Sequence, residues 1–337
     1  MLDILQRLRE REGLSRLQMR EVMTRIMSGQ AQPGQIKEFL LLLNDKGFTV
    51  EEITGAVEVM RQFVVPVSSA SSLVFDVVGT GGDGKHTLNV STIAALVVAA
   101  SGVTVAKHGN RSVSSRCGSA DVLEALGVNL LFAPDRIAGC LDKVGIAFLF
   151  AQAHHPAMKQ VAAVRKELGV KTIFNILGPL TNPAGATHQL IGVYAPFLSD
   201  MVTQVLFNLG LRRVIAVHGA DGLDEITTTA ATSITELRDG RMTTVNITPE
   251  DFGLARARDS DLTGGDVGEN AGIVMDILSG SQGPRRDIVL INSAYALYAA
   301  EQVSNPHDGL VLAARLIDSG AALSKLEQLK EFTSRAC

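Results

Sequence analysis

From Leu73 onward, short apolar runs rich in β-branched residues alternate with longer segments of helical periodicity. Four such runs are LVFDVV, VTVAKHG, HQLIGVY and RRVIAVHG, which begin at residues 73, 103, 188 and 212. Runs that are apolar on both sides are typical of strands buried in a parallel sheet, and helical segments such as STIAALVVAASG (91–102) separate them. The alternation predicts an α/β fold with a mostly parallel central sheet covered by helices on both faces.

The first 66 residues have a different pattern, because the apolar residues there recur at helical spacing throughout. Three amphipathic helices are expected, over residues 4–29, 36–47 and 50–63, the last beginning after Thr49. The N-terminal region is therefore predicted to contain helices and no strand.

Pro66 and the serine-rich VSSASS at 67–72 form the best candidate linker. Residues 154–180 are also helical in pattern and could pack back onto the N-terminal helices. The sequence thus predicts a small, discontinuous helical domain of residues 1–66, joined by about 155–180, and a large α/β domain of residues 73–337.

Composition excludes several classes of protein. Apolar residues make up 46% of the chain, as in a globular protein, and the net charge of −4 argues against a protein that coats nucleic acid. Three scattered cysteines without CxxC spacing argue against a disulfide framework or a zinc site. The charged N-terminus has no apolar signal core and no apolar stretch is long enough to span a membrane, so a cytoplasmic location is expected.

The stretch FDVVGTGGDGKHTLNVST (75–92) places four glycines in six positions between an apolar strand and a helix. Glycines let backbone N–H groups approach a ligand, and the start of a helix adds unpaired N–H donors that favour anions. Ser91 and Thr92 at the helix entrance can bind phosphate oxygens or a metal ion. The alternative is a tight turn with a serine or threonine as helix cap. The glycine spacing matches neither a P-loop nor a dinucleotide-binding fingerprint.

A second polar loop, KHGNRSVSSRCGSAD (107–121), follows the next predicted strand and is rich in hydrogen-bond donors. A solvated loop is the alternative, but solvated loops seldom combine so many donors with so few acids. Loops at the carboxyl ends of parallel strands are where open α/β sheets bind ligands. Two donor-rich loops after neighbouring strands indicate a polyanionic ligand.

A third loop, in VIAVHGADGLDEI (214–226), carries the acids Asp221, Asp224 and Glu225. Carboxylates close to an anion site would repel the ligand unless a cation lies between them, and Mg²⁺ is the usual cation. The alternative, an acidic turn at the surface, is favoured for Asp221 and not for the Asp224–Glu225 pair.

A fourth segment, HHPAMKQVAAVRKELG (154–169), places Arg165 ten residues after His155. In a helix this spacing is about three turns, so both side chains could lie on one side. The guanidinium of an arginine matches a carboxylate in bidentate fashion. A buried histidine and a surface arginine are the alternative. No Ser-His-Asp order, paired general-acid carboxylates or reactive cysteine emerges from the chain.

Taken in order, these four stretches resemble the motifs of the anthranilate phosphoribosyltransferase family, and GENAGIVMDILSG and RDIVLINSAYALYAAE extend the resemblance over essentially the whole chain. It implies the fold of the nucleoside phosphorylase type II and anthranilate phosphoribosyltransferase superfamily, with the active site in the cleft between a helical and an α/β domain. It also implies transfer of the phosphoribosyl group of phosphoribosyl pyrophosphate (PRPP) to the amino nitrogen of anthranilate, in L-tryptophan biosynthesis. The implied enzyme requires magnesium, is a homodimer joined through its helical domains, and binds neither nucleic acid nor membrane.

The resemblance also assigns site residues. Implied PRPP-binding residues are Gly79, Gly82, Asp83, Thr87, Asn89, Val90, Ser91, Thr92, Lys107, His108, Gly109, Asn110, Arg111, Ser112, Val113, Ser114, Ser115 and Ser119. Implied anthranilate-binding residues are Gly79, Asn110, His155, Arg165 and Pro179. Ser91, Asp224 and Glu225 are the implied ligands of two Mg²⁺ ions per subunit. No catalytic acid or base is assigned, and His108 is a candidate for taking the amine proton.

Two alternative functions remain open at this point. A pyrimidine nucleoside phosphorylase-like enzyme would share the fold and the glycine-rich loop, but its second loop has another pattern and it has no counterpart of the segment around Arg165. A non-catalytic, nucleic-acid-binding relative would be expected to lose the acidic pair and gain basic surface.

Overall fold

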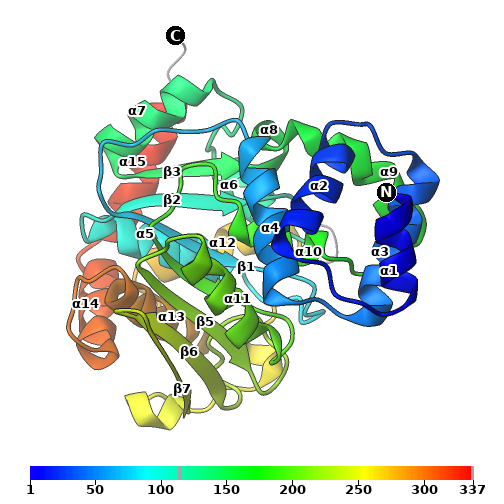
Figure 1. The fold of residues 1–337 in the computed structure, drawn as a ribbon. Helices are drawn as coiled ribbons and strands as arrows, with labels where there is room; N and C mark the ends of the chain where they lie inside the picture. The colour runs from blue at the N-terminus through cyan, green and yellow to red at the C-terminus, as the bar shows by residue number, and fades with distance from the viewer. Residues whose placement is uncertain (113–115, 335–337) are drawn as a thin grey trace.

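Seven strands form one sheet in the computed structural model, which describes residues 1–112 and 116–334 (Figure 1). The strand order across the sheet is β3-β2-β1-β4-β5-β6-β7, and β1 to β5 pair in parallel. The predicted mostly parallel sheet is therefore confirmed. The strands are β1 (Val74–Gly79), β2 (Thr104–Gly109), β3 (Ile146–Phe150), β4 (His188–Gly192), β5 (Arg213–Gly219), β6 (Thr232–Arg238) and β7 (Arg241–Ile247).

An antiparallel hairpin of β6 and β7, absent from the sequence expectations, extends the sheet at one edge. Asp239 and Gly240 connect the two strands with φ values of 51° and 73°. Such left-handed values at both central positions are typical of the tight hairpin turns that Asp-Gly favours.

The N-terminal region is helical, as expected, but contains four helices where three were predicted. Instead of one helix over residues 4–29, the chain forms α1 (Leu2–Arg9) and α2 (Arg16–Met27). Ser15 begins α2 with a capping box, since its hydroxyl accepts a hydrogen bond from the Gln18 N–H at 3.3 Å. The other two helices are α3 (Pro33–Lys46) and α4 (Val50–Gln62); Thr49 caps α4 as predicted.

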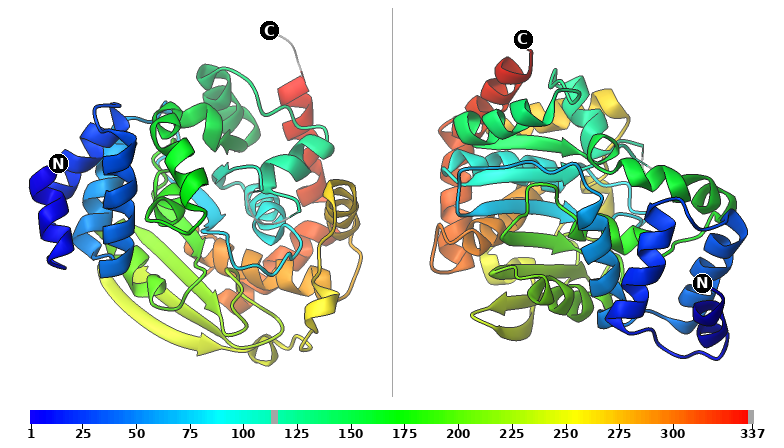
Figure 2. Two further views of the ribbon diagram at one scale, coloured as in Figure 1. Left: turned by 90° about the vertical axis from the view of Figure 1, so that its right-hand side faces the viewer. Right: turned by 45° about the horizontal axis from the view of Figure 1, so that its top comes forward.

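The remaining helices cover the sheet or join the N-terminal group. Helices α1 to α4, α9 (Lys159–Leu168) and α10 (Phe174–Leu177) lie together at one side of the sheet (Figures 1 and 2). Helix α9 packs against α2 and α3. The division of the chain into two domains stays a prediction. The α-helices after α4 are α5 (Val90–Ala100), α6 (Ser119–Ala125), α7 (Pro134–Val144), α8 (Ala151–His154), α9 (Lys159–Leu168), α10 (Phe174–Leu177), α11 (Leu198–Asn208), α12 (Val267–Leu278), α13 (Pro284–Ala299), α14 (Pro306–Asp318) and α15 (Ala321–Ser334).

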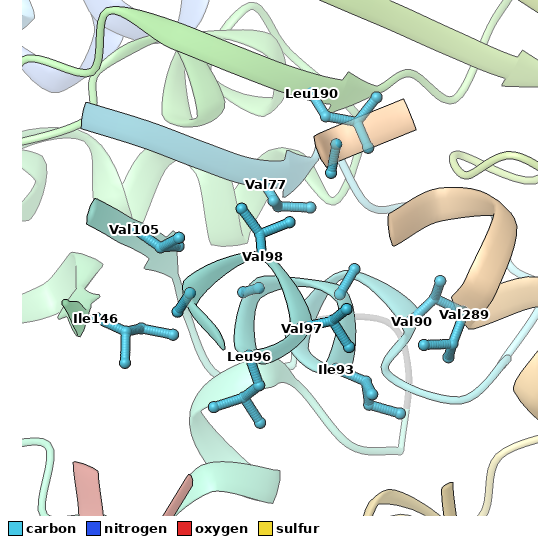
Figure 3. Packing of buried hydrophobic residues seen from close by; sticks show 14 of the residues in the cluster. Val77, Val90, Ile93, Leu96, Val97, Val98, Val105, Ile146, Leu190 and Val289 are labelled. Carbon is cyan, nitrogen blue, oxygen red and sulfur yellow. The ribbon is translucent and has the colours of Figure 1, made fainter. Parts of the chain in front are cut away.

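Both faces of the sheet are apolar and pack against different helices. Along β5, Ile215 and Val217 belong to one hydrophobic core, while Val214 and Ala216 belong to the other. Figure 3 shows α5 in the first core, among side chains from β1, β2, β3 and β4. The second core continues from the sheet into the N-terminal helices. Because successive side chains of a strand enter the two hydrophobic cores in turn, these strands are apolar throughout.

The sheet opens between β1 and β2 toward its carboxyl edge. The two strands pair only at Val74 and Phe75, after which each pairs with its other neighbour alone. In the gap, the Asp76 carboxylate accepts a hydrogen bond of 3.1 Å from the His108 N–H, and Lys107 Nζ donates to the Val77 carbonyl at 2.7 Å. Side chains thus replace the missing ladder bonds at the edge where the polar loops begin.

Within residues 1–112 and 116–334, no helix is both long and apolar enough to cross a membrane.

Candidate functional site

The glycine-rich loop and the acidic loop meet at the carboxyl edge of the sheet. A Cβ atom on Gly79 would lie 2.5 Å from Asp224 Oδ2, and one on Gly192, at the end of β4, would lie 1.6 Å from the Asp224 carbonyl oxygen. The Gly81 N–H donates a hydrogen bond of 2.7 Å to Asp224 Oδ2. Bare backbone is therefore needed here so that the acidic loop can approach, and Gly81 and Gly82 also have φ values of 64° and 77°.

Helix α5 presents its first turn to this meeting point. Its N-cap is Asn89, which makes no side-chain cap, so the alternative of a serine or threonine as helix cap does not hold. Ser91 lies in the first turn, where its hydroxyl accepts a hydrogen bond of 3.2 Å from Lys107 Nζ and its backbone N–H donates to Glu225. Thr92, one position on, is buried. The start of the helix, Lys107 and Glu225 thus share one small region.

Asp224 and Glu225 are adjacent, half-buried carboxylates that repel each other. Burial, and then the charge of Asp83, raises the pKa of Asp224. Burial, and then the charge of Asp224, raises the pKa of Glu225, which Lys107 opposes. Lys107 thus offsets the charge of Glu225, while Asp83, Asp224 and Glu225 repel one another, and a divalent cation would relieve that repulsion.

The donor set fits magnesium that is shared with a phosphate ligand. Magnesium in such sites takes one or two carboxylates, keeps several waters and completes its shell with substrate oxygens. Accordingly, no group of three His, Cys, Asp or Glu side chains in the described residues is arranged to hold a metal alone. Asp221 plays another part: its carboxylate accepts hydrogen bonds from the hydroxyls of Thr227 at 2.7 Å and Thr229 at 2.5 Å. It braces the acidic loop, whereas the sequence favoured a surface turn.

The second polar loop borders the same edge. The charge of Arg111 is already balanced, because its guanidinium pairs with Asp121 at 2.9 Å and with Glu124 at 2.5 Å, both on α6. Ser119 Oγ donates to the Asn110 carbonyl at 3.3 Å, and Gln152 Nε2 donates to Asn110 Oδ1 at 3.4 Å. Val113, Ser114 and Ser115 lie outside the described residues.

His108 and His155 form a buried pair between β2 and the turn after α8. Their Nε2 atoms are 3.1 Å apart, so one ring donates to the other. Burial, and then the charge of His154, lowers the pKa of His155 to about 4. Burial and the neighbouring His155 lower the pKa of His108 well below its usual value. Both rings are therefore neutral at pH 7. Pro179, another of the residues that the resemblance assigns to the acceptor, is also buried.

Arg165 lies on α9, but the helical spacing predicted from His155 is wrong. His155 lies between α8 and a 3-10 turn over Pro156–Met158, and α9 begins only at Lys159. The guanidinium of Arg165 lies 5.5 Å from the centre of the Phe174 ring. Within the described residues it forms no ion pair, and burial lowers its pKa. A half-buried guanidinium without an acidic partner can bind a carboxylate from outside the chain.

Sequence reasoning missed Asp76, which is buried and bonded to the backbone of β2. An acid inside the apolar run LVFDVV was the available signal, since a buried carboxylate needs partners.

Two family models describe the chain. The model "Glycosyl transferase family, helical bundle domain" matches residues 2–64, and "Glycosyl transferase family, a/b domain" matches residues 71–323. An anthranilate phosphoribosyltransferase of Symbiobacterium thermophilum is 51% identical over 99% of this chain and 98% of its own length. That of Moorella thermoacetica is 54% identical over 94% of both chains.

Among solved structures, the chain is similar to anthranilate phosphoribosyltransferases. An anthranilate phosphoribosyltransferase from Thermus thermophilus has a TM-score of 0.94 and 41% identity, covering 99% of this chain and 100% of its own. One from Saccharomyces cerevisiae in complex with PRPP and Mg has a TM-score of 0.90 and 27% identity, covering 99% and 97%. The same yeast enzyme with 4-fluoroanthranilate has a TM-score of 0.85 and 27% identity, covering 95% and 94%.

Proposed function

The chain belongs to the anthranilate phosphoribosyltransferase family, and we propose that it transfers the phosphoribosyl group of PRPP to the amino nitrogen of anthranilate, with release of pyrophosphate, in L-tryptophan biosynthesis. The observation that carries this proposal is the junction of the glycine-rich loop with the acidic loop at Asp224. It combines close backbone, a helix start and carboxylates, as a magnesium-bound diphosphate requires.

The phosphoribosyl donor is assigned to the two loops after β1 and β2. The glycine-rich loop supplies backbone N–H groups and the start of α5, while Asp83 can accept from ribose hydroxyls. Lys107 and the donors after it supply the remaining contacts. Val113, Ser114 and Ser115 are retained as donor-binding residues on the sequence pattern alone.

Magnesium is assigned to Ser91, Asp224 and Glu225, with two ions per subunit and Glu225 shared between them. The raised pKa values of the two carboxylates support a cation at this place. The yeast relative, which was solved with PRPP and Mg, supports the same metal. When bound, the metal would neutralise charge that develops on the departing pyrophosphate.

Anthranilate is assigned to the region of Arg165 and the histidine pair. The unpaired guanidinium of Arg165 can hold the carboxylate of the acceptor, with Gly79, Asn110, His155 and Pro179 around the ring. The amine would then face the anomeric carbon, so that positioning supplies much of the rate. His108 stays the candidate for taking the amine proton, although its lowered pKa and its bond to His155 make it a weak base.

The protein is further proposed to be a cytoplasmic homodimer joined through its helical region. Leu2 and Leu17, on α1 and α2, have 73% and 65% of their surface exposed. Large apolar side chains exposed on one group of helices support an interface there.

The test is the fluorescence of anthranilate during incubation with PRPP, with and without Mg²⁺. Loss of signal only when PRPP and Mg²⁺ are both present is expected. An unchanged signal together with phosphorolysis of pyrimidine nucleosides would instead favour the phosphorylase alternative. Binding of nucleic acid without either activity would favour the non-catalytic one.

A further inference from the structure

Lys171 connects the helical group of the fold to the glycine-rich loop. It lies between α9 and α10, and its own carbonyl accepts a hydrogen bond of 2.6 Å from Asn44 Nδ2 on α3. Its Nζ donates to the Gly82 carbonyl at 2.7 Å. A single residue thus joins α3 to the loop that follows β1.

The ammonium group is held by a second contact. Nζ lies 3.7 Å from the centre of the Tyr194 ring, just beyond the end of β4. The Tyr194 N–H in turn donates to Thr80 Oγ1 at 3.0 Å. An ammonium over an aromatic face is attracted by the ring, so the Tyr194 ring adds to the bond with Gly82 in holding Nζ in place.

The two halves of the glycine-rich loop are fixed by different parts of the chain. The second half is tied to the segment before α12, because Leu88 N–H donates to the Leu262 carbonyl at 3.1 Å and Gly264 N–H donates to the His86 carbonyl at 3.0 Å. The first half contacts Asp224 through Gly81 and Lys171 through Gly82. Of these contacts, the one to Lys171 comes from the helical side.

A lysine at this position fixes the direction of an N–H group. The peptide bond is planar and trans, so the N–H of Asp83 points opposite to the carbonyl of Gly82. Because the Gly82 carbonyl points at Lys171, the Asp83 N–H points away from it. Gly82 has a φ of 77° and no side chain, and would otherwise leave this peptide free to rotate.

We propose that Lys171 is a positioning residue for the phosphoribosyl donor, a role that rests on the proposed function. It holds the Gly82–Asp83 peptide in one orientation and ties it to α3, so the donor loop is formed before the donor binds. Removing the ammonium group should then weaken donor binding about ten-fold or more, as expected for loss of a hydrogen bond to a charged group. Binding of the acceptor should change little.

The variants are Lys171→Met, which keeps the stem but loses the donor, and Lys171→Arg, which keeps a cation and donors. Lys166→Met is the matched control, because this lysine is exposed on the neighbouring α9 and has no polar partner among the described residues. For each, the KM values for PRPP and anthranilate, the calorimetric Kd of PRPP with Mg²⁺, and the Tm are measured.

For Lys171→Met we expect the KM and Kd for PRPP to rise about ten-fold, with the KM for anthranilate within two-fold and the Tm unchanged. Lys171→Arg should restore most of the affinity, and Lys166→Met should behave as wild type. An unchanged KM for PRPP in Lys171→Met would overturn the role, as would equal losses for both substrates together with a lower Tm. A wild-type protein without transferase activity would instead overturn the proposed function.

Discussion

Asp224 accepts a hydrogen bond of 2.7 Å from the backbone N–H of Gly81, so the acidic loop and the glycine-rich loop are joined directly. Asp224 also packs where Gly79 and Gly192 have no side chain. The glycines that suggested phosphate binding therefore have a second use, which is to admit the carboxylate proposed to hold magnesium.

Replacing Gly79 by alanine tests this packing. The added Cβ would lie 2.5 Å from Asp224 Oδ2, so the carboxylate must move. We expect kcat to fall ~100-fold or more, since small displacements of site groups have costs of that order. The measurement is transferase activity at saturating substrates. Gly272→Ala is the control, because a Cβ there meets nothing within 4 Å. Equal activity of the two variants would contradict the packing argument.

Replacing Glu225 by alanine should abolish turnover at every magnesium concentration, because the variant loses the carboxylate proposed to be shared by two ions. A magnesium titration of the initial rate is the measurement. Glu250→Ala serves as the control, since this glutamate pairs with Arg256 at the surface. Wild-type activity in Glu225→Ala would refute the metal assignment.

Replacing Arg165 by alanine should raise the KM for anthranilate about ten-fold or more, because a charge-assisted hydrogen bond is lost. The KM for PRPP should change little. Steady-state kinetics with each substrate varied in turn are the measurement. A selective rise in the KM for PRPP would remove Arg165 from the acceptor pocket.

Replacing His155 by glutamine should make the protein less sensitive to acid. In the unfolded chain a histidine binds a proton near pH 6.5, but in the folded protein His155 does so only near pH 4. Between these values the unfolded state binds more protons, so the free energy of unfolding falls as the pH falls. The decrease between pH 7 and pH 4, followed by urea unfolding, should be about 3 kcal/mol smaller in the variant. His108 and His154 would keep part of the acid sensitivity, and parallel curves for variant and wild type would contradict the prediction.

Replacing Glu52 by alanine should destabilise the helical region. This fully buried carboxylate accepts hydrogen bonds from the Leu14 N–H at 2.8 Å and from Lys46 Nζ at 2.9 Å. Its loss leaves the buried ammonium of Lys46 without its ion-pair partner and with a bond to the Gly47 carbonyl, at a cost of about 2–4 kcal/mol. Urea unfolding measures the change, with the exposed Glu51→Ala as control. A cost below about 1 kcal/mol would be too small for a buried pair.

Much of the site could be predicted because its residues directly follow apolar strands. Gly79 ends β1, Lys107 lies near the end of β2, and Asp224 follows β5. The carboxyl ends of parallel strands meet at one edge, so local runs of sequence were enough to bring these residues together. The Asp239–Gly240 turn is also visible in the sequence, because Asp-Gly is a typical hairpin turn, so this hairpin could have been predicted.

Contacts between distant segments that do not both follow strands could not be predicted. Lys171 lies 89 residues from Gly82, and nothing in its neighbourhood indicates that contact. Asp76 accepts a hydrogen bond from β2 where β1 and β2 stop pairing, and the position of that break depends on the whole sheet. The spacing from His155 to Arg165 failed because Pro156 follows directly after His155, and the residue before a proline is disfavoured in a helix.

The most direct test of the proposed activity is to measure, in one reaction, the anthranilate consumed and the pyrophosphate released. We expect equal amounts of both, and neither consumption of anthranilate nor release of pyrophosphate when PRPP or Mg²⁺ is left out. Pyrophosphate release without loss of anthranilate would keep PRPP as the donor and contradict the acceptor. No release by a folded protein supplied with PRPP, anthranilate and Mg²⁺ would contradict the transferase activity itself.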